Sequence, residues 1–551
     1  MVKKLMGNFS DWTSMPSKTV GSAALVIALA GVASRFLGFI RDRILASTFG
    51  AGDVLDAYYT AFRIPDLLYS FLVVGALGAA FVPVFTGLWE DHKKEAAWKL
   101  TSGVLHLLLF GLGAFALVGF LFASQLTDML APGFSEEKKA LVTELTRIML
   151  LSPLLLSISA VFGGVLVSFK RFAAYSLAPV FYNVGIIIGA VFLTPVMGPV
   201  GLAWGVVIGA LFHMLVQYPA LLRSGFHYRP AFLDALKDAS VRRVLTLMIP
   251  RSLSVGVNQI SLLVMTVFAS TLISGSLAAF TLANNIQSVP LGLFGISFAL
   301  AAFPSLSIFA AKKSGKDFFT VLSHTTRRIL FFVVPLSVLM VVFRAQFVRV
   351  ILGTGQFDWE DTILTFEILK FLALSLFAQS LIPLFARAFF ALQNTKTPLY
   401  IALVSEAVHI ALIPLLLPTY AAEGLAIAFS VASILNFMLL YIFLRRQLSF
   451  WKDSEIFLPS LKIFVAALLA GGIAQASKSI FALTTDELDT FVEVFLQLVT
   501  GLTIGGTAFL FIAYWLKVRE LDIVKRFIMC KLLRQPETVV LTKDYPEKGE
   551  W

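Results

Sequence analysis

Apolar runs of about twenty residues recur from one end of this 551-residue chain to the other. A run of that length can cross the hydrocarbon core of a membrane as a helix, because a helix satisfies its backbone polar groups within the segment. Hydrophobic residues make up 58% of the chain and charged residues only 14%, whereas a soluble domain carries roughly 25% charged residues. We therefore expect an all-α integral membrane protein.

The apolar windows predict about fourteen spanning helices. Their approximate ranges are 20–48, 54–89, 95–124, 138–168, 172–194, 200–223, 244–273, 275–310, 318–351, 360–391, 396–417, 422–446, 457–482 and 487–516.

Positive charge is distributed unevenly among the loops between these spans. Lys and Arg gather in the N-terminal segment 1–19, in alternate loops and in the basic tail 521–551, whereas the other loops contain almost none. This asymmetry predicts that both termini are cytoplasmic and that the number of helices is even. The net charge of +11 is thus mainly a topology signal, with some affinity for anionic membrane lipids. It does not indicate a nucleic-acid partner.

The chain also contains an internal repeat. Residues 163–223 align without a gap with residues 386–446, at a constant shift of 223 positions. Two sets of six similar helices predict an N-lobe at 20–230 and a C-lobe at 231–450, with a substrate path between them and alternating access by rocking. The last two helices, within 451–520, lie outside the repeat.

Signatures of catalysis are absent from the sequence. The single cysteine, Cys530, excludes an intramolecular disulfide, a four-thiolate zinc site and an iron–sulfur cluster. No Walker A loop, HExxH motif, nucleophile elbow or cluster of metal-binding carboxylates occurs. We therefore expect a transporter rather than an enzyme, without ATP or a cofactor. Its energy source would be a Na⁺ or H⁺ gradient or the membrane potential.

Charged side chains interrupt the first two apolar runs. The stretch "SRFLGFIRDRILASTFG" contains Arg35, Arg41 and Asp42, and the second run carries Asp56 and Arg63 on one stripe. A charge at mid-bilayer costs about 2.5–3.5 kcal/mol, so it normally faces protein or water. Ionisable stripes on two consecutive helices therefore predict a shared polar interior.

Later spans add further polar side chains. Arg251 lies in "MIPRSLSVGVNQI", Asn285 in "ANNIQ", and Arg387 on the tenth span. Guanidinium groups hold phosphate by paired, charge-assisted hydrogen bonds, so several arginines around a wet cavity suit a diphosphate. Structural roles stay open for some of these residues. Arg41 and Asp42 could form a pair that braces helices, and Arg387 could lie at the membrane interface.

Glu406 and His409 stand three residues apart on the eleventh span, a spacing that permits a buried acid–imidazole pair. Cation coupling and a purely structural pair both fit this spacing. The sequence indicates no metal site beyond it.

Several segments, taken in order, resemble the MurJ (MviN) family of lipid II flippases. The first two helices of that family are similar to "SRFLGFIRDRILASTFGAGDVLDAYYTAFRIPDLL", and later family segments are similar to "GALGAAFVPVF", "NQISLLVMTVFAS", "AAFPSLS" and "ARAFFALQNTKTP". The resemblance implies the MATE-like fold of the multidrug/oligosaccharidyl-lipid/polysaccharide (MOP) exporters. In that fold two six-helix lobes enclose a cationic cavity, and two further helices form a groove for a polyprenyl tail.

The resemblance also implies a function. A member of this family would move lipid II, the undecaprenyl-diphosphate-linked peptidoglycan precursor, from the cytoplasmic to the outer leaflet of the bacterial inner membrane for cell wall synthesis. The residues then expected to bind the headgroup and diphosphate are Arg35, Arg41, Asp42, Asp56, Arg63, Arg251, Asn285 and Arg387.

The chain departs from the family pattern at a few positions. Tyr69, Ser70 and Asn285 stand where many members carry cationic residues, and His409 stands where asparagine is common. An exporter of another polyprenyl-linked saccharide, such as a surface polysaccharide or teichoic acid unit, therefore stays open as an alternative. A cation-coupled drug antiporter fits less well, because it calls for an acidic cavity. A membrane scaffold without transport activity is a fourth hypothesis.

Overall fold

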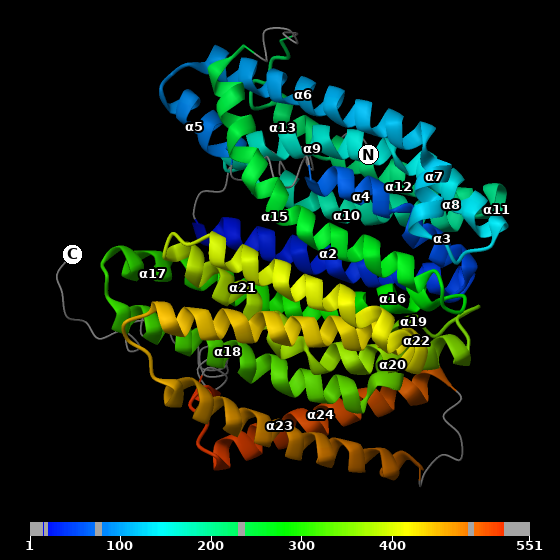
Figure 1. The fold of residues 1–551 in the computed structure, drawn as a ribbon, viewed down its shortest axis with the longest axis vertical. Coiled ribbons are helices and arrows are strands. Elements are labelled where there is room, and N and C mark those ends of the chain that lie inside the picture. The colour runs from blue at the N-terminus through cyan, green and yellow to red at the C-terminus, as the bar shows by residue number, and fades with distance from the viewer. Residues whose placement is uncertain (1–14, 16–19, 72–79, 230–236, 483–489, 523–551) are drawn as a thin grey trace, which may run out of the picture. The chain divides into compact units, whose positions relative to one another are not determined.

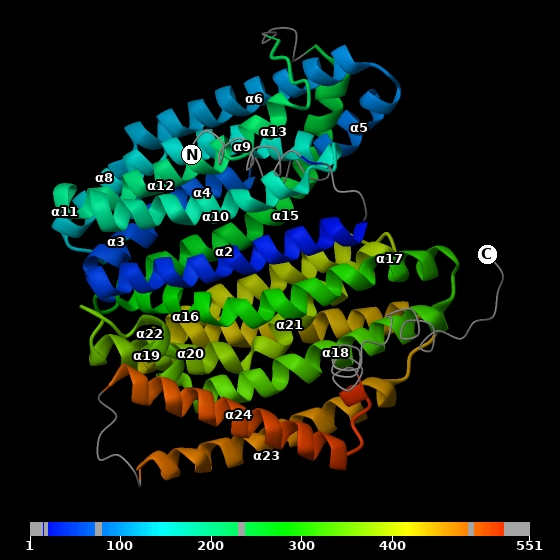
Figure 2. The ribbon, with the colours of Figure 1, turned by 180° about the vertical axis from the view of Figure 1, so that it is seen from behind.

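The computed structural model describes residues 15, 20–71, 80–229, 237–482 and 490–522, without the side chains of 20–25, 249–258 and 480–482. Every regular element within the described residues is a helix (Figures 1 and 2). The predicted all-α class is confirmed. Large apolar side chains such as Phe120, Phe192 and Phe511 are exposed on these helices, as expected where a helix faces lipid.

The elements up to residue 269 are α2 (Val20–Phe49), α3 (Asp53–Ala61), α4 (Arg63–Tyr69), α5 (Val82–Glu90), α6 (Lys94–Leu121), α7 (Ala123–Leu130), α8 (Glu136–Met149), α9 (Leu151–Ser168), α10 (Phe172–Ile188), the π-helical turn η3 (Gly189–Leu193), α11 (Thr194–Met197), α12 (Val200–Leu215), α13 (Tyr218–Leu222) and α15 (Ala239–Ala269). Those that follow are α16 (Ser276–Pro290), the π-helical turn η4 (Leu291–Ile296), α17 (Ser297–Ala311), α18 (Gly315–Val342), α19 (Arg344–Leu352), α20 (Trp359–Leu374), α21 (Leu376–Ala391), α22 (Lys396–Gln447), α23 (Asp453–Ala482) and α24 (Phe491–Trp515).

Each of the expected spans overlaps one helix or a run of consecutive helices. By length and apolar composition, nine helices of the described part could cross a membrane, or ten if the bent pair α20 and α21 forms one span. The difference from fourteen has local causes. The described part of α2 carries four charged side chains, the span expected at 54–89 is divided among α3, α4 and α5, and α15 includes undescribed side chains. The count of fourteen stays a prediction.

Helix α22 is one of these nine helices, although it covers the two spans expected at 396–417 and 422–446. The backbone of Ala421 is not helical, with φ 44° and ψ −127°, so two helices meet at a kink there. Pro414 and Pro418 precede the kink, and each removes a backbone donor from the helical ladder. The turn expected between 417 and 422 is therefore present, but it is compressed into the kink.

Small residues set the closest helix packing in the N-terminal part of the chain. A Cβ atom added to Gly185 would lie 2.2 Å from the Cα atom of Gly209, and one added to Gly189 would lie 2.3 Å from that of Gly205. Glycines spaced four apart thus let the backbones of α10 and η3 touch that of α12, as small residues do in membrane helix pairs. In both ribbon views α2 runs beside α10 (Figures 1 and 2).

The chain forms two compact units. The first unit consists of 1–286, 351–368 and 406–428, and the second of 287–350, 369–405 and 429–551. Within the second unit, α23 packs against α18, and α24 packs against α23 (Figure 2). The predicted boundaries at 230, 450 and 520 stay predictions.

Candidate functional site

Arg41 and Asp42 form an ion pair in the middle of a polar network on α2. The Arg41 guanidinium donates to Oδ1 of Asp42 from Nε at 2.9 Å and from Nη2 at 2.7 Å. The amide of Asn285 on α16 donates to Oδ2 of Asp42 at 2.9 Å. Three of the residues expected at the site therefore lie together, and the carboxylate compensates the charge of Arg41.

Asn183 on α10 completes this network. Its amide oxygen accepts from Nη1 of Arg41 at 3.0 Å, and its amide nitrogen donates to the backbone oxygen atoms of Pro179 and Ser34 at 3.1 and 3.3 Å. Asp42 is buried, whereas the Arg41 side chain keeps 23% of its surface exposed. The pair thus links α2 to α10 and α16, while the Arg41 side chain stays partly exposed.

Arg35 lies one and a half to two turns earlier on α2 and has a different environment. Its side chain is exposed and lines a cavity of about 670 Å³ in the first unit. The cavity lies between α2, α9, α10 and the end of α12, and its polar lining includes Ser159, Tyr175, His213 and Gln217. No carboxylate is among its lining residues, and no ion pair of Arg35 is found in the described part of the chain.

Arg63 begins α4 and is partly buried. Its Nε donates to the hydroxyl group of Thr266 on α15 at 2.8 Å. As for Arg35, the described residues place no carboxylate within ion-pair distance of it. Asp66, three residues further along α4, still attracts the Arg63 guanidinium electrostatically. Because an uncompensated charge within a membrane is costly, Arg35 is therefore the guanidinium group best suited to an anionic ligand.

Asp56 contacts neither the Arg41–Asp42 network nor the cavity around Arg35 in any hydrogen bond found among the described residues. It is 2% exposed, and its carboxylate accepts from Nζ of Lys138 at 2.8 Å and from the backbone N–H groups of Gly275 and Ala278, both at 2.8 Å. A carboxylate at the start of α16 is favoured by the helix dipole and by the free N–H groups there. These contacts give Asp56 a structural role, and its part in headgroup binding stays a prediction.

Asp53 joins the same cluster from the first turn of α3. Its Oδ1 accepts from Nζ of Lys138 at 2.7 Å and from the hydroxyl group of Ser274, also at 2.7 Å. The hydrogen bond from Lys138 lowers the pKa of Asp53 below its usual range.

The structure does not place two of the expected arginines, Arg251 and Arg387, in the network or the cavity described above. The side chain of Arg251 lies outside the described residues, although its backbone belongs to α15. Arg387 belongs to the second unit, where its guanidinium donates to the carbonyl oxygen of Pro383, one turn earlier on α21, at 3.2 Å. Their roles in headgroup binding stay predictions.

The positions that depart from the family pattern have specific surroundings. Tyr69 lines the cavity that contains Arg35. The hydroxyl group of Ser70 accepts from the amide of Gln259 at 2.8 Å. Polar but uncharged side chains thus stand at the places where cationic residues were expected.

Glu406 and His409 form the acid–imidazole pair that their spacing permits. Nδ1 of His409 lies 2.9 Å from Oε1 of Glu406 and 3.1 Å from the hydroxyl group of Ser261. Hard cations require several oxygen ligands, whereas this set combines one carboxylate and one hydroxyl group with an imidazole. These residues suit a proton better than a metal ion, and within the described residues no group of three or more acidic, His or Cys side chains could hold a metal.

Sequence reasoning missed several members of the site. Asn183, Thr266, Ser159, Gln217 and His213 were not among the residues expected at the site. Each is a polar residue within an apolar run, which is the signal that could have drawn attention to them. The pairing of Asn183 with Arg41 across 142 positions carries no local signature.

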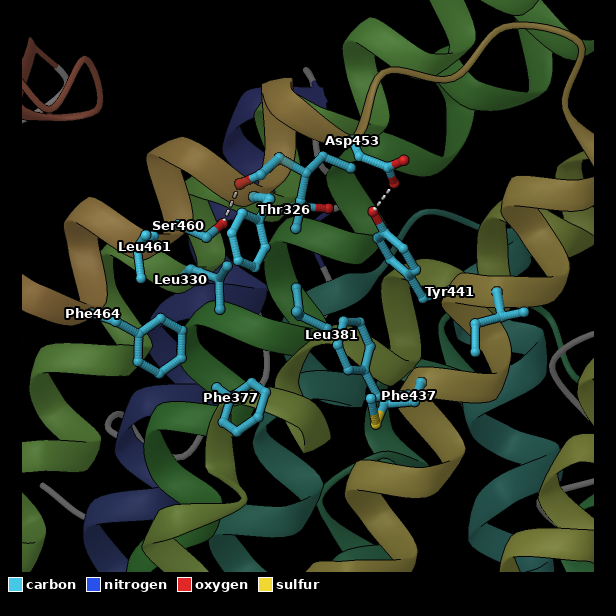
Figure 3. A pocket seen from close by; sticks show the side chains of 14 residues that line it. Thr326, Leu330, Phe377, Leu381, Phe437, Tyr441, Asp453, Ser460, Leu461 and Phe464 are labelled. Carbon is cyan, nitrogen blue, oxygen red and sulfur yellow. Dashed lines mark hydrogen bonds between the residues drawn. The ribbon is translucent and has the colours of Figure 1, made fainter.

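An apolar cavity of about 510 Å³ lies in the second unit (Figure 3). Side chains of α18, α21, α22 and α23 line it, including Leu330, Phe377, Phe437 and Phe464. At one edge the hydroxyl group of Tyr441 donates to Asp453 at 2.8 Å. A second apolar cavity of about 390 Å³ shares Phe377 and Phe464 with it and continues along α18 and α23. Helices α18, α21 and α23 contribute to the lining of both cavities. No described residue of α24 lines either of them.

Comparison with known protein families gives a match over most of the chain. The sequence model of the family described as "Lipid II flippase MurJ" matches residues 45–513. A probable lipid II flippase MurJ of Thermotoga maritima is 31% identical over 502 residues, which cover 91% of this chain and 98% of that protein. The lipid II flippase MurJ of Burkholderia cenocepacia is 30% identical over 470 residues, which cover 82% of this chain and 89% of that protein.

Solved structures agree on the architecture. A structure described as "Lipid II flippase MurJ, inward closed conformation" has a TM-score of 0.74 at 23% identity and covers 93% of this chain and 100% of that one. An inward-facing multidrug transporter of the MATE family in the MOP superfamily has a TM-score of 0.65 at 15% identity, over 75% of this chain and 94% of that one. At these identities the likeness establishes the fold, which is the MATE-like MOP fold.

Proposed function

Because the chain belongs to the lipid II flippase MurJ family, as the sequence resemblance predicted, we propose that it moves lipid II from the cytoplasmic to the outer leaflet of the bacterial inner membrane. Both termini would lie in the cytoplasm, as the loop charges predict. The family match favours this substrate over other polyprenyl-linked saccharides and over small drugs.

The observation that carries the proposal is the environment of Arg35. Its guanidinium is exposed in a large cavity without a carboxylate partner among the described residues. A diphosphate offers the paired oxygen atoms that match this group. Arg63 is the second anchor, and Arg41 contributes when the phosphate competes with Asp42 for its guanidinium group.

Headgroup transfer would proceed by alternating access, with the site open first to one leaflet and then to the other. The membrane potential or a cation gradient would supply the energy. Glu406 and His409 are our candidates for coupling, because a hydrogen-bonded carboxylate and imidazole can take up and release a proton. The polyprenyl tail would lie against apolar surface such as the two cavities along α23.

Complementation tests this proposal. The wild-type chain is expected to restore growth of a bacterium whose own lipid II flippase is depleted. Arg35→Ala combined with Arg63→Ala should fail although the protein reaches the membrane. Arg147→Ala, which removes an exposed arginine on α8, should still restore growth. A well-expressed wild type that does not rescue, or full rescue by the double variant, would contradict the proposal.

A further inference from the structure

The cavity around Arg35 contains a buried amide with an unmet hydrogen bond. Gln217 is 1% exposed, and its amide nitrogen donates to the hydroxyl group of Ser159 at 2.6 Å and to the carbonyl oxygen of His213 at 3.2 Å. Its amide oxygen accepts no hydrogen bond from any residue that the structure describes. A buried acceptor without a donor is unfavourable, so it favours a partner beyond those that the described residues supply.

The neighbours of Gln217 fix the orientation of that amide. The hydroxyl group of Ser159 lies 2.7 Å from Nδ1 and 3.0 Å from the carbonyl oxygen of His213. Because the amide nitrogen has both of its hydrogen bonds on this side, the amide oxygen is directed to the other side, toward Gly163. A Cβ atom at Gly163 would lie 3.2 Å from this oxygen and 2.9 Å from the ring of Tyr175.

Tyr175 therefore lies beside the unmet acceptor. Its side chain is 45% exposed, so the ring can turn about its side-chain torsions and open the amide oxygen to the cavity. The neighbouring Ser176 adds a buried hydroxyl group for which the described residues supply no partner. Gln217 and Ser176, which both line this cavity, thus each have one buried polar atom without a partner among the described residues.

The lining restricts what this cavity can bind. Arg35 supplies positive charge, and the described lining residues include no carboxylate, so a cationic ligand is disfavoured. The remaining polar groups are neutral hydroxyl, amide, phenol and imidazole groups, which suit hydroxyl and amide groups of a ligand. The volume of about 670 Å³ falls within the roughly 300–1,000 Å³ of small-molecule sites. It suits one part of a large headgroup rather than the whole.

We propose that this cavity is a sugar subsite. One ring of the saccharide lies between Tyr175 and the wall formed by Ser159, His213 and Gln217. A hydroxyl or amide N–H group of the sugar donates to the Gln217 oxygen, while Arg35 binds the attached phosphate. This inference rests on the proposed function, because it assigns the part of lipid II that each side of the cavity recognises.

The test compares two lipids on the purified full-length protein, undecaprenyl diphosphate and lipid II, with affinities measured by titration in native mass spectrometry. Gln217→Leu should lower the affinity for lipid II about tenfold, as expected for the loss of one buried hydrogen bond. Its affinity for undecaprenyl diphosphate should stay unchanged, which also shows that the variant is folded.

Ser159→Ala tests the positioning of the amide and has a matched control. Ser159 and Ser157 both lie on α9 with 0% exposure, but Ser157 donates to the carbonyl oxygen of Leu154 and does not line the cavity. Ser159→Ala should lower the affinity for lipid II alone, by less than Gln217→Leu does. Ser157→Ala should change neither affinity.

Two outcomes would overturn the sugar subsite while leaving the proposed function intact. One is an equal loss of affinity for both lipids in Gln217→Leu, and the other is an unchanged affinity for lipid II in that variant. A wild-type protein that binds neither lipid would overturn the proposed function as well, so the two failures are distinguishable.

Discussion

Arg35→Ala is expected to lower the affinity of the purified protein for lipid II by about ten- to a hundredfold. A hydrogen bond to a charged group contributes about 1.5–3 kcal/mol, and the Arg35 guanidinium has no carboxylate partner among the described residues. Its loss would therefore be a loss of ligand contacts, with little effect on the fold. Titration in native mass spectrometry measures the change.

Arg35→Lys separates charge from geometry. Lysine keeps the charge but not the planar pair of donors, so an intermediate affinity is expected. Arg147→Ala is the matched control, because it removes an exposed arginine of α8 and should leave the affinity unchanged. An Arg35→Ala protein that binds lipid II as tightly as the wild type would refute the role of this residue.

Lys138→Met is expected to lower the free energy of unfolding by about 3–5 kcal/mol, because removing one partner of a buried ion pair leaves the other charge uncompensated. Lys138 is 8% and Asp56 2% exposed, so water replaces little of the lost contact. A lower midpoint of thermal unfolding in detergent should report the change.

The control for Lys138→Met is the same substitution at Lys139, the next residue along the chain. Its partners Asp128 and Glu136 are exposed, and exposed ion pairs contribute only about 0–1 kcal/mol. Lys139→Met should therefore shift the midpoint little. Equal shifts for the two lysine variants would show that the pair with Asp56 does not stabilise the fold as we argue.

Much of the fold follows from the sequence because membrane helices need long apolar runs. The windows at 95–124 and 487–516 reappear as α6 and α24 with ends that differ by a few residues. The turn between the two halves of α22 has no glycine and no polar loop, so its form as a kink at Ala421 could not be read from local pattern. The contact of α10 with α12 through Gly185 and Gly209 likewise depends on tertiary packing and has no local sequence signal.

The site was predictable only in part. Charges within apolar runs identified Arg35, Arg41 and Arg63, because such charges are too costly to occur without a reason. The same rule cannot separate a ligand-binding charge from a structural one. Asp56 shows this limit, since its partners Lys138 and Gly275 lie 82 and 219 positions away. Burial and pairing, which need coordinates, make the distinction.

The most direct test of the central claim, that the cavity around Arg35 receives the headgroup, is protection of an introduced thiol. The chain has one cysteine, so a Cys530→Ser background carries no reactive thiol. Gly31→Cys in this background introduces an exposed thiol at the cavity, where an added Cβ atom meets no other atom within 4 Å, and Thr271→Cys introduces an exposed control outside it. We predict that lipid II slows labelling of the Gly31→Cys protein by a charged thiol reagent and leaves the Thr271→Cys protein unaffected. Labelling of the Gly31→Cys protein at the same rate with and without saturating lipid II would show that the headgroup does not enter this cavity.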